Sequence, residues 1–327
     1  MCLLAADIHQ RSTDIVTALI THPACLEHEP HPRHPERPDR LRAILAALTE
    51  DAFPDLTVLT APSASREALE RAHAKAHVET ILDTLNAEAV RSGHAVIDAD
   101  TAMSAGSAEA ALRAAGALCL AVDQVMSGKV HNAFCAVRPP GHHAERDRAM
   151  GFCLFNNVAV AAYHAREAYG IKRIAIVDFD VHHGNGTQNI FWDDADALYI
   201  STHQMPLYPG SGDSSERGAA NNILNLPLPP GANGSQFRAL FDARIIPALE
   251  QFKPEFLFIS AGFDAHAEDP LANLRLTEDD FAWATYRLCA FAEHACGGRV
   301  VSTLEGGYDL DALARSAAAH MHALREF

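Results

Sequence analysis

The sequence lacks long hydrophobic runs, paired cysteine motifs and an excess of positive charge. No uncharged apolar stretch approaches the roughly 18 residues that a membrane-crossing helix needs, so we expect no membrane partner. The 7 cysteines are odd in number and form no Cys-x-x-Cys pair, which predicts reduced thiols in the cytoplasm. Lys and Arg number 26 against 42 Asp and Glu, and a net charge of −16 disfavours direct nucleic-acid binding.

The composition that remains is that of an ordinary globular protein. Hydrophobic residues make up 48% and charged residues 21% of the 327 residues, enough to bury a large core. No linker, repeat or low-complexity tract divides the chain, so we expect a single domain over residues 1–327. The acidic balance would attract a cationic small molecule or a Lys-rich peptide, although solubility alone is an equally good explanation.

Short β-rich runs alternate with Ala- and Leu-rich helical stretches. Runs 173–179 and 255–261 are almost continuous in Ile, Val, Leu and Phe, as strands buried on both faces require. The expected strands are 17–22, 57–61, 133–138, 173–181, 197–203, 222–228, 255–263 and 299–304, and the expected helices include 103–126, 156–169, 236–251 and 277–296. Residues 22–40, dense in Pro and His, are expected to be a loop. This alternation predicts an α/β fold with a mainly parallel sheet, and a closed (β/α)₈ barrel is the alternative.

Polar clusters follow four of the expected strands. They occupy residues 138–144, 178–188, 260–266 and 304–309. Because polar sites gather at the carboxyl ends of parallel strands in either architecture, we expect these clusters to meet at one rim.

One of these clusters has the spacing of a metal site. Side chains alternate faces in an extended segment, so Asp178, Asp180 and His182 should point the same way. Asp-x-His can offer one oxygen and one nitrogen to a metal ion, and Asp264 could supply a third ligand. Such a set with an open position suits catalytic Zn²⁺, and Fe²⁺, Co²⁺ or Mn²⁺ could also fit. Taken alone, the Asp–His pair is better explained as a hydrogen-bonded loop cap, and the other polar clusters expected at the same rim reverse that preference.

Two anionic ligands acidify a bound water less than three histidines would, so such a site benefits from an external base. The tandem His142–His143 is the candidate, because histidine exchanges protons near neutral pH. Asp178 could orient one imidazole, and Asn185 could accept a hydrogen bond from the other without charging it. A structural pair bonded to loop carbonyls is the alternative for two adjacent histidines.

Aromatic residues complete the candidate site. Tyr308 follows two glycines that let the backbone bring its phenol inward, where it could donate to a developing oxyanion. Gly151 with Phe152, and Tyr208, could wall a narrow apolar slot. An ordinary rim tyrosine is the alternative for Tyr308, and simple core packing is the alternative for Phe152 and Tyr208.

Ordered motifs connect the chain to a known family. RPPGHHA, GFCLFNN, DFDVHHGNGTQ, YPGSG, SAGFDAH and LEGGYD, preceded by HPERPDRL, resemble the histone deacetylase and acetylpolyamine amidohydrolase superfamily, in particular its class II-like bacterial members. The resemblance spans about residues 20–320. It implies an arginase-like α/β fold with one eight-stranded, mainly parallel sheet covered by helices on both faces. It also implies zinc-dependent hydrolysis of an acylated amine to free amine and acetate.

The resemblance also assigns roles to the residues that match its motifs. The implied zinc ligands are Asp180, His182 and Asp264. His143 corresponds to the general base and acid, and His142 to its electrostatic partner, paired with Asp178. Asn185 stands where some relatives have Asp. Tyr308 matches the tyrosine that polarises the amide carbonyl.

Further residues match the family's substrate channel and cation sites. Phe152 and Tyr208 match the aromatic walls, the Gly151 carbonyl can accept the substrate N–H, and Asp100 matches a rim aspartate that grips substrate backbone in some members. A structural K⁺ beside the zinc is implied at Asp178, Asp180, His182, Ser201 and Thr202. A second K⁺ is implied near Phe191, so the resemblance leaves one or two potassium ions open.

One sequence position narrows the expected class of substrate. Polyamine-specific relatives tend to carry an acidic residue where this chain has Leu271, which favours an acyl-lysine side chain or a similar acylamine. Glu27, Glu29 and Asp100 could still supply negative charge near the mouth, so an acetylpolyamine amidohydrolase is the alternative. A two-manganese ureohydrolase would want a carboxylate at Gly184. A non-catalytic acyl-lysine-binding protein would be expected to lose a ligand or Tyr308. A homo-oligomer is left open.

Overall fold

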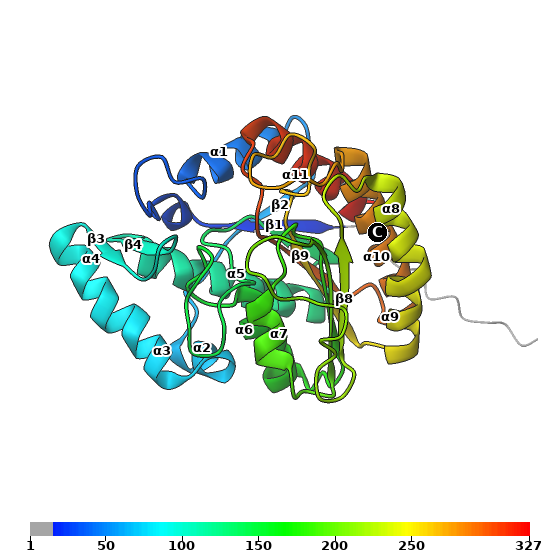
Figure 1. Ribbon diagram of the computed structural model, residues 1–327, viewed down its shortest axis with the longest axis horizontal. Coiled ribbons are helices and arrows are strands. Elements are labelled where there is room, and N and C mark those ends of the chain that lie inside the picture. The colour runs from blue at the N-terminus through cyan, green and yellow to red at the C-terminus, as the bar shows by residue number, and fades with distance from the viewer. Residues whose placement is uncertain (1–15) are drawn as a thin grey trace, which may run out of the picture.

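The centre of the computed structural model, which describes residues 16–327, is one parallel sheet (Figure 1). Its order is β2-β1-β5-β10-β9-β6-β7-β8, and every neighbouring pair is parallel. The strands are β1 Thr17–Thr21, β2 Thr57–Thr60, β5 Asn132–Cys135, β6 Ile174–Asp178, β7 Ala197–Gln204, β8 Ile223–Leu228, β9 Phe256–Ala261 and β10 Val300–Leu304. All eight expected strands are confirmed. The barrel alternative is wrong, because β2 and β8 are the two edges of an open sheet.

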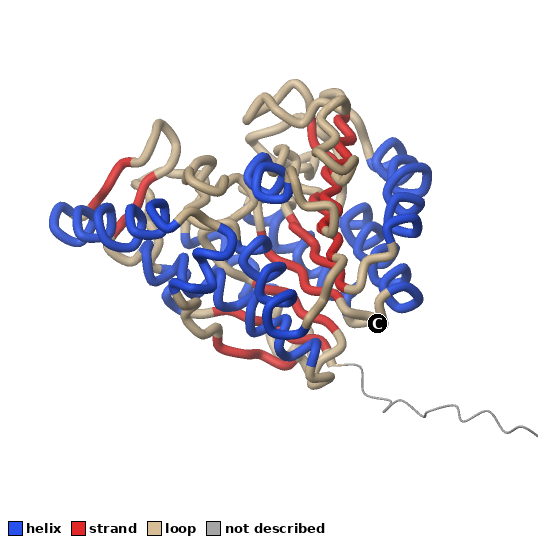
Figure 2. The backbone as a smooth tube through the Cα atoms, turned by 90° about the horizontal axis from the view of Figure 1, so that it is seen from below, coloured by secondary structure: helices blue, strands red, loops and turns tan. Residues whose placement is uncertain are grey.

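Helices cover both faces of this sheet (Figure 2). They are α1 Pro38–Ala47, α2 Arg66–Ala72, α3 Lys75–Glu79, α4 Asn86–Ser92, α5 Ser107–Met126, α6 Asn157–Tyr169, α7 Asn185–Phe191, α8 Gly234–Leu240, α9 Ile246–Phe252, α10 Glu278–Ala295 and α11 Leu310–Leu324. Helices α1, α10 and α11 pack together on one side, and α2, α5 and α6 on the other (Figure 1). Strands β6 and β9 are therefore buried along their whole length, which explains their continuous apolar runs.

Other elements differ from the expectations in detail. The expected helix 236–251 is α8 and α9 joined by a π-helical turn, Phe241–Ile245, and a similar turn, Thr80–Leu85, joins α3 to α4. An antiparallel hairpin, β3 His94–Val96 and β4 Ala102–Ser104, precedes α5. The 22–40 segment is not wholly a loop: it contains a 3₁₀ turn, Pro23–Leu26, and α1 begins at Pro38, where proline fits because the first helical N–H needs no partner.

Strand β6 ends earlier than its apolar pattern predicts. The extended segment stops at Asp178, and residues 179–184 form bends and loop. The side chains after Asp178 are thus positioned by loop contacts and not by strand alternation alone. Among the described residues, no helix has the length and apolarity needed to cross a membrane.

A buried histidine links two layers of the core. His320 of α11 is fully buried and bonds through Nδ1 to Thr285 Oγ1 of α10 at 2.6 Å. Its Nε2 bonds to Ser302 Oγ of β10 at 2.8 Å. Burial lowers the pKa of His320 to about 3, because the charged ring would lose its hydration.

We expect this histidine to make the fold sensitive to acid. Below pH 6.5 the unfolded chain protonates His320 while the folded protein keeps it neutral until about pH 3. Stability should therefore fall across that window by about 1.4 kcal/mol per pH unit for this one group. His320→Gln should be less stable at pH 7 but lose stability less steeply between pH 6 and pH 4, as measured by urea unfolding. The exposed His294→Gln is the control, and equal slopes for His320→Gln and the native protein would contradict the prediction.

Candidate active site

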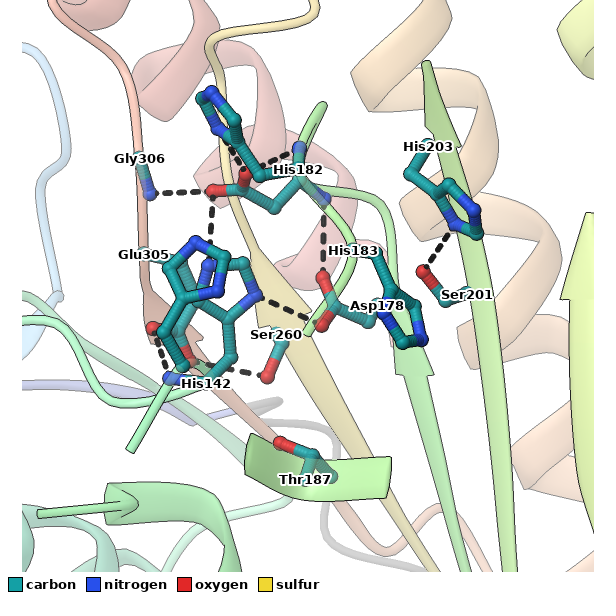
Figure 3. Close-up of polar contacts among 12 residues, drawn as sticks. His142, Asp178, His182, His183, Thr187, Ser201, His203, Ser260, Glu305 and Gly306 are labelled. Carbon is teal, nitrogen blue, oxygen red and sulfur yellow. Dashed lines mark hydrogen bonds and ion pairs between the residues drawn. The ribbon is translucent and has the colours of Figure 1, made fainter. Parts of the chain in front are cut away.

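The four polar clusters meet at the carboxyl ends of β5, β10, β9 and β6, which are consecutive strands of the sheet. His142 follows β5, Glu305 follows β10, Asp264 follows β9, and Asp178 ends β6. Figure 3 shows side chains from these strand ends pointing toward one another. The sheet order thus turns four segments that are distant in the sequence into one buried site.

Two carboxylates and one imidazole form a compact group within this site. His182 Nδ1 lies 3.1 Å from Asp180 Oδ1 and 3.1 Å from Asp264 Oδ2. One possible ligand atom from each of the three residues lies within 4.8 Å of the others, and all three residues are buried. The structure therefore brings together the three ligands that the sequence predicted.

Backbone groups aim the two carboxylates. Val181 N donates to Asp264 Oδ1 at 2.8 Å, and Gly306 N donates to Asp180 Oδ2 at 2.7 Å (Figure 3). A side chain on Gly306 would collide with both carboxylates, so this glycine of the LEGGYD motif is required for the close approach of the loop.

The electrostatics of this group suit a divalent cation. Burial opposes a charged imidazole, but hydrogen bonds to Asp180 and Asp264 outweigh it and raise the pKa of His182 to about 10. Burial, and then the neighbouring Asp180 carboxylate, raise the pKa of Asp264 to about 7. The buried carboxylates of Asp180 and Asp264 repel each other unless positive charge lies between them. A dication supplies more positive charge there than one shared proton does. One nitrogen and two oxygen donors therefore fit Zn²⁺, Fe²⁺, Co²⁺ or Mn²⁺.

The two histidines of RPPGHHA lie beside this group and differ in charge state. His142 Nδ1 donates to Asp178 Oδ2 at 3.0 Å (Figure 3), and the Tyr199 hydroxyl donates to the same oxygen at 2.9 Å. Burial alone would lower the pKa of His142, but Asp178 and then Asp180 raise it to about 10. The two carboxylates therefore favour the protonated form of His142.

His143 is held neutral. Its ring centre lies 4.0 Å from that of His142, and its Nδ1 donates to Asn185 Oδ1 at 2.8 Å. Burial and the charges of His142 and His182 keep the pKa of His143 well below its usual value. With the proton on Nδ1, its Nε2 carries a lone pair and can accept a proton.

Tyr308 offers a free hydroxyl. Its backbone N–H donates to Asp269 Oδ2 at 2.7 Å, and its ring centre lies 4.8 Å from the Arg40 guanidinium carbon. Within residues 16–327 the phenol hydroxyl makes no hydrogen bond. The tyrosine is thus held through its backbone N–H and through the face of its ring, while its hydroxyl can donate to another molecule.

The two predicted aromatic walls lie on different sides of the site. The Tyr208 ring is 5.2 Å from that of His143 and 6.2 Å from that of His182. The Phe152 ring is 6.0 Å from that of Tyr308. Tyr208 therefore lies beside the two histidines, and Phe152 lies beside the tyrosine.

Gly151 and Asp100 lie beside the Phe152 wall. The Gly151 carbonyl accepts a weak hydrogen bond from Cys153 Sγ at 3.3 Å. Thr101 Oγ1 accepts the Phe152 N–H at 3.1 Å and donates to Asp100 Oδ1 at 2.8 Å. Asp100, which is partly exposed, is therefore placed at the outer edge of this wall.

Leu271 lies near the Tyr308 side. Its N–H donates to Asp269 Oδ1 at 2.9 Å, and the other oxygen of this carboxylate holds Tyr308. The residue is partly exposed, so its side chain contributes an uncharged surface at that side of the site.

The residues of the implied potassium site are also together. Asp178 of β6 is in register with Ser201 of β7, and both are fully buried. Asp180 N donates to Asp178 Oδ1 at 3.1 Å, while Ser201 Oγ bonds to His203 Nδ1 (Figure 3). Thr202 Oγ1 is buried with no hydrogen-bond partner among the described residues. This oxygen-rich, buried environment suits a hard cation.

Glu305 is a residue that the sequence reasoning missed. Its Oε2 accepts the N–H groups of Gly141 at 2.7 Å and His142 at 3.1 Å, and its Oε1 accepts Ser260 Oγ at 3.1 Å (Figure 3). Burial raises its pKa to about 7. Glu305 fixes the turn that carries the histidine pair. An acidic residue directly after a fully buried strand was the available signal.

A buried ion network behind the site was missed too. Arg138 Nη2 donates to Glu36 Oε2 at 2.6 Å, and Arg40 Nη1 donates to Glu36 Oε1 at 3.0 Å. Arg40 Nη2 also donates to the Glu305 carbonyl at 2.6 Å. The network ties the Pro- and His-rich segment to the loop that carries the tyrosine. Both arginines and Glu36 lie within the quoted motifs.

Comparisons with known proteins agree with this arrangement. The family model described as histone deacetylase domain matches residues 34–324. The histone deacetylase-like amidohydrolase of Pseudomonas aeruginosa is 40% identical over 314 residues, covering 94% of this chain and 80% of that protein. A probable deacetylase of Archaeoglobus fulgidus is 38% identical over 300 residues, covering 91% and 82%. The crystal structure of the HDA15 HD domain superposes with a TM-score of 0.89 at 38% identity, covering 95% of this chain and 88% of that chain.

Proposed function

The chain belongs to the histone deacetylase family and is an amidohydrolase, and from that premise we propose that it is a zinc-dependent deacetylase acting on an acylated amine. The substrate is an acetyl-lysine side chain or a similar acylamine, and the products are the free amine and acetate. The observation that carries the proposal is the buried group of Asp180, His182 and Asp264 beside a neutral His143.

The reaction divides among the chain's own residues. Zn²⁺ held by the three ligands would supply a Lewis acid for the amide carbonyl and acidify the attacking water. His143 Nε2 takes the proton of that water, and Asn185 keeps the opposite proton on Nδ1. The Tyr308 hydroxyl donates to the carbonyl oxygen as negative charge builds there. His143 then returns its proton to the leaving nitrogen.

The predicted channel residues support this substrate class. Phe152 and Tyr208 would pack on the methylene chain of the amine, and the Gly151 carbonyl would accept its amide N–H. Asp100 would bind polar groups at the mouth. Leu271 leaves an uncharged surface beside Tyr308, which favours acyl-lysine over an acylated polyamine.

A competition assay tests the proposal. The zinc-loaded protein receives equal amounts of an acetyl-lysine peptide and acetylated spermidine or putrescine, and released acetate and both amines are quantified. We expect faster release from the peptide. Faster release from the polyamine would make the protein an acetylpolyamine amidohydrolase. No release from either would contradict the deacetylase proposal.

Two further properties belong to the same proposal. A structural K⁺ at Asp178, Ser201 and the neighbouring main-chain oxygens would support the loop that carries Asp180 and His182. The cytoplasm is the expected location, and the six cysteines of residues 16–327 being free supports a reducing compartment.

Glu145 provides a test of how the base is oriented. Its Oε1 accepts Asn185 Nδ2 at 2.8 Å, which turns the amide oxygen of Asn185 toward His143. The backbone of Glu145 is held by two hydrogen bonds: its N–H donates to Arg148 O, and its carbonyl bonds to His73 Nδ1. Glu145→Ala should lower kcat on the order of tenfold with little change in KM, as losing an outer partner of a site residue does.

Glu145→Gln is the matched variant, because its amide oxygen can still accept from Asn185. It should keep most of the native kcat. If the Ala variant were as active as the native enzyme in steady-state assays, Glu145 would have no role in orienting Asn185.

A further inference from the structure

Three main-chain carbonyls converge on one side-chain nitrogen near the end of α7. Asn222 Nδ2 lies 2.8 Å from Phe191 O, 3.1 Å from Asp194 O and 3.1 Å from Ala197 O. We call these three oxygens the carbonyl triangle. Asn222 is only 4% exposed, and its own carbonyl accepts the Tyr199 N–H at 2.9 Å. Its backbone is thereby tied to β7 while its side chain points into the triangle.

The carboxamide has one acceptable orientation. The reverse orientation would place Oδ1 against three carbonyl oxygens, with no proton between them. In the orientation observed, Asn222 Oδ1 accepts the Ala220 N–H at 3.3 Å. The primary amide of Asn222 has two N–H protons, so it cannot donate a separate proton to each of the three carbonyl oxygens. Converging carbonyl oxygens of this kind are the ligands that hard monovalent cations prefer.

A glycine makes room for the side chain. Gly218 has φ +69°, and a Cβ there would collide with Asn222 Oδ1 and lie 2.7 Å from Ile223 Cγ1. The carboxamide therefore fits a space that the surrounding chain leaves for it. A cation contacting all three carbonyls from the side of Asn222 would compete with Nδ2 for the same place.

The family resemblance does not decide whether the chain binds one potassium ion or two, and it places the second near Phe191. The geometry at Asn222 points to one potassium ion. We infer that in this chain the Asn222 carboxamide replaces the second cation and cross-links the end of α7, the start of β7 and the start of β8. This junction is then held together at any potassium concentration. The inference concerns a site away from the metal-ligand group, so it stands or falls independently of the deacetylase proposal.

Anomalous diffraction with thallium(I), a heavy substitute for K⁺, tests the inference. Crystals of the native protein and of Asn222→Gly are grown with the same thallium salt. We expect no anomalous peak at the carbonyl triangle in the native protein and a peak there in Asn222→Gly, which opens the space. Asn221→Gly is the matched control, because it removes an exposed neighbouring carboxamide where φ is +54°, and it should show no peak.

Two results would overturn the inference. A native peak in contact with the three carbonyls would show that the cation and not the carboxamide fills the triangle. An empty triangle in Asn222→Gly would show that the carbonyls do not form a cation site. If that variant fails to fold, Asn222→Ser takes its place.

Thermal unfolding gives a second readout that needs neither crystals nor activity. In potassium chloride compared with choline chloride at equal ionic strength, Asn222→Gly should gain several degrees of Tm beyond the gain of the native protein. Asn221→Gly should gain no more than the native protein. Equal gains in all three proteins would count against a cation site at the triangle.

Discussion

Replacing Tyr308 by Phe should lower kcat on the order of 10²- to 10³-fold, the loss that follows removal of one donor to a developing oxyanion. The substitution deletes only the hydroxyl, which makes no hydrogen bond within the described part of the chain. The backbone contact to Asp269 and the stacking on Arg40 remain. Folding stability and metal content should therefore stay close to native while turnover of an acetyl-lysine peptide falls.

The measurement combines steady-state kinetics, bound zinc and Tm on the same preparation. Tyr286→Phe is the matched control, since Tyr286 is exposed on α10 and its ring packs against Phe327. It should be as active as the native enzyme. Unchanged turnover in Tyr308→Phe would remove the phenol from the mechanism, and a large loss of Tm would mean that the hydroxyl has a structural role.

The strands could be predicted because doubly buried parallel strands leave a strong pattern. Ile174–Asp178 and Phe256–Ala261 are almost wholly apolar, so their existence is fixed locally. Helix α7 has no comparable signal. Its sequence NGTQNIF contains a glycine and few strong helix formers, and tertiary contacts such as Thr187 N to His142 O hold it in place. Its helical form therefore follows from the site around it.

The same distinction applies within the site. Asp180, His182 and Asp264 could be proposed because the strand-end rule brings segments after neighbouring strands together. Glu305 and Glu145 act by accepting hydrogen bonds from groups far away in the sequence, and no local pattern encodes those partners. Candidate residues for the chemistry could thus be proposed from type and spacing, whereas the residues that orient them required the structure.

Asp264→Asn should abolish tight zinc binding. It should also lower kcat/KM on the order of 10³-fold, because the Lewis acid lowers the activation barrier by several kcal/mol. The amide oxygen can still accept the Val181 N–H, so the loop should keep its position. One of the two negative charges that balance the dication is lost, however, and a neutral amide is a weaker ligand. Zinc per chain should fall from near one to a small fraction, as measured by metal analysis after dialysis.

The control for this prediction is a buried carboxylate outside the site. Asp280→Asn weakens the pairing with Arg238 and the cap of α10, so it should lower Tm while leaving zinc content unchanged. Adding excess zinc should restore part of the activity of Asp264→Asn, because the geometry of the other two ligands is intact. Full zinc retention with native activity in Asp264→Asn would contradict the ligand assignment. Loss of zinc in both Asp264→Asn and Asp280→Asn would mean that the loss reflects impaired folding. Only the change of a zinc ligand should lower zinc content without lowering stability.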